Sequence, residues 1–451
     1  MELHKRYGLA TAIAMVVGIV VGSGVFFKAE KVLAATGGDL RLGILAWVIG
    51  GLIMVICAYT FSVMAARYQY VNGVVDYAEA TVGKGYAYSI GWFLAVIYYP
   101  TLTSVLAWVS ARYASVLLGF SIVGPECMVL AGFFLIQAYA LNTLSPVLAG
   151  RFQVSTTVIK MIPLLLMAVL GTVAGLRSGM TVENFTTVVT GVDAGPALFT
   201  AVCATAFAYE GWIVATSINA ELKNGRRDLP RALVAGALIV VAAYILYYIG
   251  LAGSVSNRAM MESGETAVRT AFEEIFSRAG GTALFVFVVV SCLGTLNGLM
   301  LGCVRGLYSL AARGAGPRPG VFREVGRQTN VPGNSAVFGL MMCAFWLLYF
   351  YGANLTGTGW FGPFSFDTSE LPIITIYAAY LPILLLFMKK EKGLSAFKRF
   401  VMPALSCLSC LFMMVAACFS HGRAVLYYLM VFAVIMLTGA LLSGKKKKER
   451  R

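Results

Sequence analysis

Charged residues are scarce in this chain of 451 residues. They make up 12% of it, against 59% hydrophobic residues, and the mean hydropathy is +0.81. A soluble domain has about 25% charged residues, so water is not the main solvent of this chain. The polar segments between its apolar runs are short, which leaves no room for a soluble domain. The composition therefore indicates an all-α integral membrane protein, because a helix satisfies its own backbone in lipid.

Histidine is nearly absent as well. The only two, His4 and His421, lie at ends of apolar runs, and no H-x-x-x-D, H-E-x-x-H or G-x-S-x-G pattern occurs. A membrane-embedded hydrolase or acyltransferase needs a positioned base or a metal. Cys407 and Cys410 share a helix face but have no histidine or acidic neighbour, so we read them as packing residues. We expect no catalytic residue, no metal and no cofactor.

Apolar runs long enough to cross a bilayer, about 20 residues each, recur along the chain. The first continues beyond signal-peptide length and has no small-residue cleavage site before the second, so we read it as a helix. We place twelve spans in a single transmembrane domain, at residues 8–36, 41–66, 85–118, 125–146, 151–175, 196–222, 228–253, 281–313, 332–352, 369–388, 399–419 and 424–443.

The distribution of lysine and arginine tests this arrangement, because an even number of spans puts both termini on one side. Of 35 such residues, 25 fall on that side, 8 on the other and two, Arg112 and Lys160, inside spans. Cytoplasmic loops carry the excess, so we expect a protein of the cytoplasmic membrane with both termini in the cytoplasm. The net charge of +15 and the basic tail at 444–451 then reflect orientation and anionic lipid, not nucleic acid.

The first span contains Gly22-Ser23-Gly24, and these residues hold a helix poorly. We expect the helix to unwind there. Unwound backbone at membrane depth is tolerated only where it is buried in protein or lines a cavity. The break therefore predicts a site, and a helix-packing face of small residues is the alternative.

The sixth span favours the site, because the segment 207–212 places Glu210 near its middle. Ionisable residues inside a membrane indicate function by default. The two interrupted helices open two five-helix repeats, at about 8–175 and 196–388, and an odd number of spans per repeat inverts the second. Paired breaks at corresponding positions mark the binding site of a transporter. Two appended helices at 399–443 complete the expected fold.

Unwound backbone has a defined chemistry. Free N–H groups at the start of the half-helix after Gly24 suit a carboxylate. The carbonyls of residues before the breaks, such as Val20 and Phe207, suit an ammonium. A zwitterion satisfies both, so we expect a small-molecule amino acid substrate.

Lys160 in the fifth span lies too far from either end of its span to reach the membrane surface. We expect its ammonium to donate to carbonyls of the opened first helix and to the hydroxyl of Ser291 in the eighth span. A fixed cation at this place takes over the work of a bound sodium ion. A lysine that faces a watery cavity is the alternative.

Three segments, Gly22–Phe26, Phe207–Trp212 and Glu221–Arg231, together resemble the L-type amino acid transporter family of the amino acid, polyamine and organocation superfamily. The resemblance spans nearly the whole chain. It implies a LeuT-like fold of five plus five inverted helices with two appended helices. It also implies sodium-independent exchange of small neutral amino acids by alternating access, as in exchangers of alanine, serine and cysteine or of serine and threonine.

The resemblance implies roles for single residues. The substrate carboxylate is expected on the N–H groups of Ser23 and Gly24, Phe207 as an aromatic lid, and Tyr244 in the cytoplasmic wall of the pocket. The residues assigned to the substrate are Val20, Gly22, Ser23, Gly24, Phe207, Ala208, Glu210 and Tyr244, and those that replace sodium are Lys160 and Ser291.

Glu210 leaves the substrate range open. Many neutral amino acid exchangers of the resembled family have glycine there, whereas a relative that takes dibasic amino acids has an acid. We expect Glu210 to shape the break, held by local N–H groups and by lysine or arginine neighbours. Cationic substrates or proton coupling through Glu210 are the alternative, and a channel or a nutrient sensor on the same fold is another.

Animal members of the resembled family bond covalently to a heavy-chain glycoprotein through a cysteine near the position of Cys127. The loop here is short, and an isolated cysteine has no geometry that argues for a bridge. We therefore expect no such partner, only membrane lipids around the chain.

Overall fold

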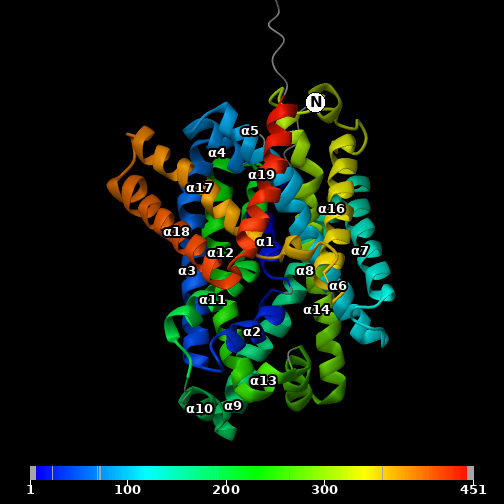
Figure 1. Cartoon of the computed structure of the whole chain (residues 1–451), viewed down its shortest axis with the longest axis vertical. Coiled ribbons are helices and arrows are strands. Elements are labelled where there is room, and N and C mark those ends of the chain that lie inside the picture. Colours follow the sequence, from blue (N-terminus) through cyan, green and yellow to red (C-terminus); the bar gives the residue numbers. More distant parts are fainter. Residues whose placement is uncertain are drawn as a thin grey trace, which may run out of the picture.

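The computed structural model describes residues 7–443 apart from 23, 69, 71, 72, 188, 190, 264 and 358. The described part is helical (Figure 1), with one isolated backbone bridge between Tyr7 and Leu222. The α-helices are α1 (Leu9–Val20), α2 (Gly24–Ala35), α3 (Leu40–Arg67), α4 (Gly73–Thr81), α5 (Lys84–Phe93), α6 (Tyr99–Leu118), α7 (Pro125–Leu144), α8 (Pro146–Leu166), α9 (Thr172–Ser178), α10 (Met180–Thr186), α11 (Ala194–Tyr209), α12 (Gly225–Ala252), α13 (Asn257–Ser263), α14 (Glu265–Ala311), α15 (Pro319–Phe322), α16 (Gly333–Asn354), α17 (Leu371–Lys390), α18 (Met402–His421) and α19 (Ala424–Leu442). The π-helical segments are η1 (Leu94–Tyr98), η2 (Met167–Gly171) and η5 (Phe397–Val401), and the 3-10 segments are η3 (Trp212–Glu221) and η4 (Gly362–Phe364).

Twelve helical segments of the described chain are long and apolar enough to cross a membrane, which confirms the number expected from the sequence. The eighth differs in its start, because α14 begins at Glu265 and loses helical geometry at Ser277 (φ 73°, ψ 174°) before the expected span. Both ends of the described chain lie at the top of Figure 1. We call this end of the bundle the terminal face and the other end the opposite face.

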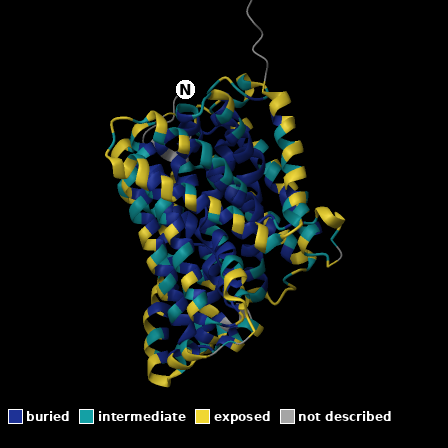
Figure 2. Cartoon of the chain, turned by 60° about the vertical axis from the view of Figure 1, so that its left-hand side comes forward, coloured by how far each residue is buried: buried dark blue, intermediate teal, exposed yellow. Residues whose placement is uncertain are grey.

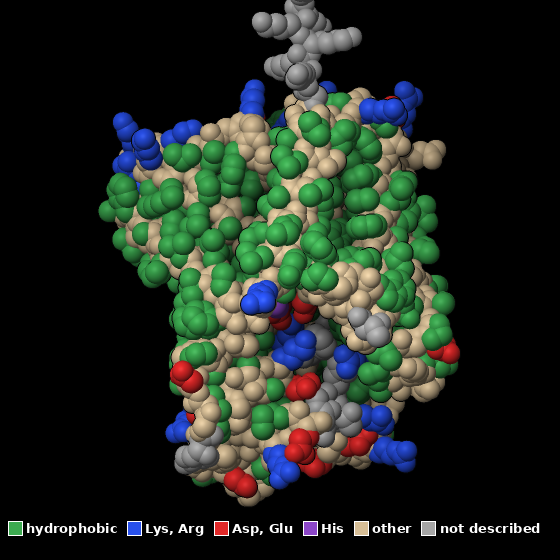
Figure 3. All heavy atoms as spheres, viewed as in Figure 1, with side chains coloured by type: hydrophobic (Ala, Val, Ile, Leu, Met, Phe, Trp, Pro, Cys, Tyr) green, Lys and Arg blue, Asp and Glu red, His purple; other side chains and the backbone are tan. Residues whose placement is uncertain are grey.

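Buried residues form a continuous column through the bundle, and exposed residues lie at its periphery (Figure 2). Hydrophobic side chains cover the flank seen in Figure 3, and basic side chains gather along the terminal face. Helix α19 is the most peripheral span, with 11% of its apolar window buried. A helix in this position suits lipid on one side, as expected of an appended helix.

Glycine permits close contact between the fifth and seventh spans. A Cβ at Gly250 of α12 would collide with the carbonyl oxygen of Met167 in η2, and a Cβ at Gly171 would collide with the carbonyl oxygen of Gly250. The two backbones therefore touch. Helices in lipid associate through such small-residue contacts, since apolar side chains gain nothing by leaving the lipid for one another.

Both expected breaks are present. The first span is interrupted between α1, which ends at Val20, and α2, which begins at Gly24. The sixth is interrupted between α11 and η3, where Glu210 is extended (φ −88°, ψ 171°) and Gly211 has φ +95°. This left-handed conformation favours glycine, which has no Cβ to clash. The two breaks are the features that position the candidate site.

Candidate functional site

A small cavity, with a volume of about 20 Å³, lies between the two breaks. This volume holds about one water molecule, so the walls of the cavity must move to admit a larger ligand. Its walls come from both interrupted helices together with α6 and α14. The lining residues are Ile19, Val20, Gly22, Gly24, Leu102, Leu106, Phe207, Glu210, Gly211, Thr295 and Leu299.

Glycine is required where the two interrupted helices meet. A Cβ at Gly24 would lie 2.6 Å from the Cα of Ala208, and a Cβ at Gly22 would lie 2.7 Å from the hydroxyl oxygen of Thr295. Contacts this short force the neighbour to move, and a backbone atom such as the Cα of Ala208 yields little. The glycines of the first break thus allow α2 to begin directly against α11.

One hydroxyl group joins the two breaks. The Tyr244 hydroxyl on α12 lies 2.9 Å from the carbonyl oxygen of Val20 and 3.1 Å from that of Ala208. Both carbonyls belong to the ends of helices whose next turn is missing, where no backbone N–H is available to them. Tyr244 therefore supplies a partner that the interrupted helices lack.

Lys160 supplies the second partner. This side chain is buried, and its Nζ donates to the carbonyl oxygen of Gly18 at 2.7 Å and to the hydroxyl of Thr295 at 3.1 Å. The Thr295 hydroxyl oxygen also lies 3.0 Å from the carbonyl oxygen of Val21. A cation at the carboxyl end of a helix is stabilising, because the helix dipole is negative there. The ammonium and the threonine together close the end of α1.

The expected contact between Lys160 and Ser291 is not formed. Ser291 is buried, and its hydroxyl has no hydrogen-bond partner in the described part of the chain. Thr295 lies four residues later on the same helix, α14, and takes the hydrogen bond instead. The prediction named the correct helix and the correct chemical group but placed them one turn too early.

Glu210 has a partner that the sequence did not suggest. Its Oε1 accepts a hydrogen bond from the hydroxyl of Tyr98 in the third span, and its Oε2 has no partner among the described residues. Of the expected support, the N–H of the neighbouring Gly211 does act on this carboxylate, whereas the side-chain partner is a tyrosine and not a lysine or arginine. Glu210 instead links the break in the sixth span to η1.

Charged contacts lie beside the cavity, on the side of the opposite face. The Nζ of Lys28 on α2 lies 5.4 Å from the ring centre of Phe207 on α11 and forms an ion pair with Glu370, which directly precedes α17. Lys28 and Glu370 are both buried. These contacts join both interrupted helices to α17 beyond the ring that lines the cavity.

A second set of contacts lies at the terminal face. The guanidinium of Arg313, beyond the end of α14, pairs with Asp76 and with Glu79, whose Oε2 lies 2.9 Å from its Nε. Both carboxylates belong to α4. In addition, the N–H of Lys223 donates to the carbonyl of Tyr7 at 2.9 Å, which ties the start of the first span to the end of the sixth. Contacts between helices thus lie on both sides of the cavity.

The structure brings most of the expected substrate residues to one place. Of the eight residues assigned to the substrate, five line the cavity: Val20, Gly22, Gly24, Phe207 and Glu210. Ala208 and Tyr244 stand behind this wall and contact each other. Ser23 lies outside the described residues.

Sequence reasoning missed Gly18, Thr295 and the apolar wall of Leu102, Leu106 and Leu299. A signal for Thr295 existed, since it follows Ser291 by four residues and so shares its helix face. No sequence signal marked the three leucines, because apolar residues inside a span are common and most of them only pack against their neighbours.

The junction at Tyr244 can be tested with a matched pair of variants. Tyr244→Phe leaves two buried carbonyls without this donor, and we expect it to destabilise the protein by about 1–3 kcal/mol. Tyr247→Phe on the same helix removes a buried hydroxyl that has no partner in the described chain, and we expect no loss. Thermal unfolding in detergent measures both, and equal behaviour of the two variants would contradict the assigned role of Tyr244.

Known proteins are similar to this chain in sequence and in fold. The family model for amino acid permeases matches residues 7–441. The serine/threonine exchanger SteT of Bacillus subtilis (strain 168) is 31% identical over 312 residues, 69% of each chain. The human cystine/glutamate transporter is 23% identical over 334 residues, which are 73% of this chain and 66% of its own. The human b(0,+)-type amino acid transporter 1 is 25% identical over 316 residues, 69% of this chain and 64% of its own.

A solved structure, that of MhsT in complex with L-phenylalanine, superposes with a TM-score of 0.60. It is 15% identical and the match covers 96% of this chain and 100% of the other. Identity this low supports only the fold, which is the LeuT-like arrangement expected from the paired breaks. The family match, by contrast, runs almost from end to end, and the relatives are transporters and not enzymes. The chain therefore belongs to the amino acid permease family, as an amino acid transporter of the L-type branch.

Proposed function

We propose that this protein exchanges small neutral L-amino acids across the cytoplasmic membrane by alternating access, without sodium. The observation that carries the proposal is that two interrupted helices line one cavity. Carbonyl groups end α1 and α11 there, and N–H groups begin α2. Each end of a zwitterion then has a partner of opposite polarity.

The backbone divides the two charges of the substrate. We assign the carboxylate to the N–H groups at the start of α2, around Gly24 and Ser23. We assign the amine to the carbonyls of Val20 and Phe207. Val20 already accepts one hydrogen bond from Tyr244, but a carbonyl oxygen has a second lone pair. These contacts are common to all amino acids, so the surrounding side chains set the selectivity.

The size and apolar character of the cavity support small neutral substrates. Leu102, Leu106 and Leu299 line it, and the ring of Phe207 covers one side. A cavity with room for about one water molecule must widen to admit a substrate, and a small side chain requires the least widening. The similarity to a serine/threonine exchanger points the same way.

The contacts of Lys160 support sodium independence. Its Nζ lies at the end of α1 and is hydrogen-bonded to the carbonyl of Gly18 and the hydroxyl of Thr295. Carbonyl and hydroxyl oxygens are the ligands that a sodium ion would use. A lysine that already occupies this place leaves no vacancy for the ion.

The 25 to 8 division of lysine and arginine supports cytoplasmic termini. The terminal face then lies on the cytoplasmic side.

Cys127 is buried at the start of α7, which supports the expectation that no heavy chain is attached through it.

Glu210 favours a second candidate function, the transport of cationic amino acids or proton coupling. It lines the cavity, and its Oε2 has no partner in the described part of the chain. A free carboxylate oxygen beside a substrate site can receive a side-chain cation or a proton.

A channel or a sensor is distinguished from an exchanger by trans-stimulation, since only the influx of an exchanger depends on internal amino acid.

The sodium claim is tested in proteoliposomes loaded with serine. Uptake of radiolabelled serine should require internal serine and should not change when choline replaces sodium outside. Lys160→Ala should reduce exchange about tenfold or more, because buried acceptors lose a charged donor worth at least 1–3 kcal/mol. Ser291→Ala, on the facing helix, removes a hydroxyl without a described partner and serves as the control. A strict sodium requirement in the wild type would contradict the proposed sodium independence.

The role of Glu210 is tested by measuring alanine, serine and arginine exchange in the wild type and in Glu210→Gly. If the carboxylate mainly ties the break to Tyr98, all three activities should fall together, and Tyr98→Phe should reproduce the effect in milder form. Arginine exchange lost while alanine exchange survives would instead establish the cationic alternative.

A further inference from the structure

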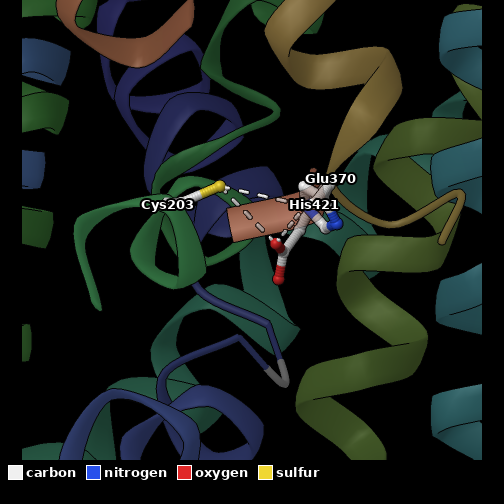
Figure 4. A group of neighbouring side chains, drawn as sticks. All are labelled: Cys203, Glu370 and His421. Carbon is white, nitrogen blue, oxygen red and sulfur yellow. Dashed lines mark hydrogen bonds and ion pairs between the residues drawn. The ribbon is translucent and has the colours of Figure 1, made fainter. Parts of the chain in front are cut away.

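Three side chains that can bind metals converge outside the cavity (Figure 4). Cys203 belongs to α11, Glu370 directly precedes α17, and His421 ends α18. The Nε2 of His421 lies 2.9 Å from the Oε2 of Glu370, and the Sγ of Cys203 lies 3.6 Å from this same oxygen. The Sγ and the Nε2 are 4.0 Å apart.

These separations match those of ligands around one tetrahedral ion. Zinc binds thiolate sulfur at about 2.3 Å and imidazole nitrogen or carboxylate oxygen at about 2.0–2.2 Å, which puts two ligand atoms roughly 3.3–3.6 Å apart. The three observed separations, 2.9, 3.6 and 4.0 Å, lie on both sides of that value. Small side-chain movements therefore suffice to place an ion between them.

The surroundings suit a bound ion. Cys203 and Glu370 are buried, and an apolar cluster that includes Phe366, Leu371 and Tyr428 surrounds Cys203. The side chain of His421 is 14% exposed, which leaves a way in from outside. Figure 3 shows histidine and charged side chains together in a hollow of the otherwise apolar flank.

We propose that Cys203, Glu370 and His421 form a binding site for Zn²⁺, with the fourth position open to water. On binding, the thiol of Cys203 loses its proton to solvent and the sulfur bonds to the metal, while neutral His421 and ionised Glu370 supply the other two ligands. No oxidation or reduction is involved. The Lys28 ammonium stays on the other carboxylate oxygen. Because this ammonium repels a dication, we expect Zn²⁺ to bind more weakly here than at structural zinc sites.

A bound ion would restrain the contacts that Lys28 and Glu370 make beside Phe207. Cys203 precedes Phe207 by one helical turn on α11, and Glu370 holds Lys28 of α2 against the ring of Phe207. The ion ties α11 directly to α17 and α18. Alternating access requires the two interrupted helices to move relative to such neighbours. Zinc should therefore inhibit exchange. This inhibition rests on the proposed function, whereas the binding of zinc does not depend on it.

Binding is measured on the purified full chain without a histidine tag, by competition for Zn²⁺ with a zinc-responsive dye. We expect one bound ion per chain. Cys203→Ser and His421→Gln should weaken binding by more than about tenfold, since even outer-shell partners of metal sites contribute that much. Cys418→Ser, an exposed cysteine three residues before His421, should bind like the wild type. Equal binding by all four proteins, or no binding by the wild type, would overturn the site.

The restraint is measured as serine exchange in proteoliposomes with Zn²⁺ on both sides. Inhibition should appear in the wild type and in Cys418→Ser, and Cys203→Ser should need at least about tenfold more zinc. Zinc that binds to the wild type without slowing exchange would overturn the restraint. If no serine exchange occurs even without zinc, the proposed function fails, while the dye measurement still decides the site.

Discussion

A transmembrane helix that stops halfway across the bilayer leaves carbonyl and N–H groups that lipid cannot satisfy, at a cost of several kcal/mol for each group. This chain contains two such helices, and they face each other. Side chains from other spans satisfy the carbonyl ends. Tyr244 serves α1 and α11 together, and Lys160 with Thr295 serves α1. The candidate site depends on this division of the backbone groups.

The partners of the two breaks differ in kind. The end of α1 holds a fixed cation, whereas the end of α11 continues into a carboxylate that is tied to Tyr98. The start of α2 has no comparable fixed anion in the described chain. In the proposed assignment, a substrate that carries its own carboxylate completes this set, so an amino acid should fit the site better than an amine or an anion alone. Glycine at positions 22 and 24 brings the two helices close enough for one molecule to reach both.

Much of this arrangement could be predicted from sequence. Hydropathy predicts the twelve spans because the bilayer fixes their length, and Gly22, Gly24 and Glu210 indicate the breaks because they are costly inside a span. Tyr98, by contrast, is 112 positions from Glu210, and no local pattern connects them. Ser291 and Thr295 share one face of α14, so the choice between them depended on how far α14 is shifted along its axis, which helical spacing does not fix. Cys203, Glu370 and His421 meet only through the packing of three helices.

The division of substrate charge between the two breaks is tested most directly by competition against radiolabelled serine exchange. The competitors are serine, its methyl ester, the corresponding decarboxylated amine and N-acetylserine. Each derivative leaves one set of backbone groups unpaired, a loss of about 1–3 kcal/mol. The account predicts that all three derivatives compete roughly tenfold or more worse than serine. Competition by the simple amine as strong as that by serine would contradict it.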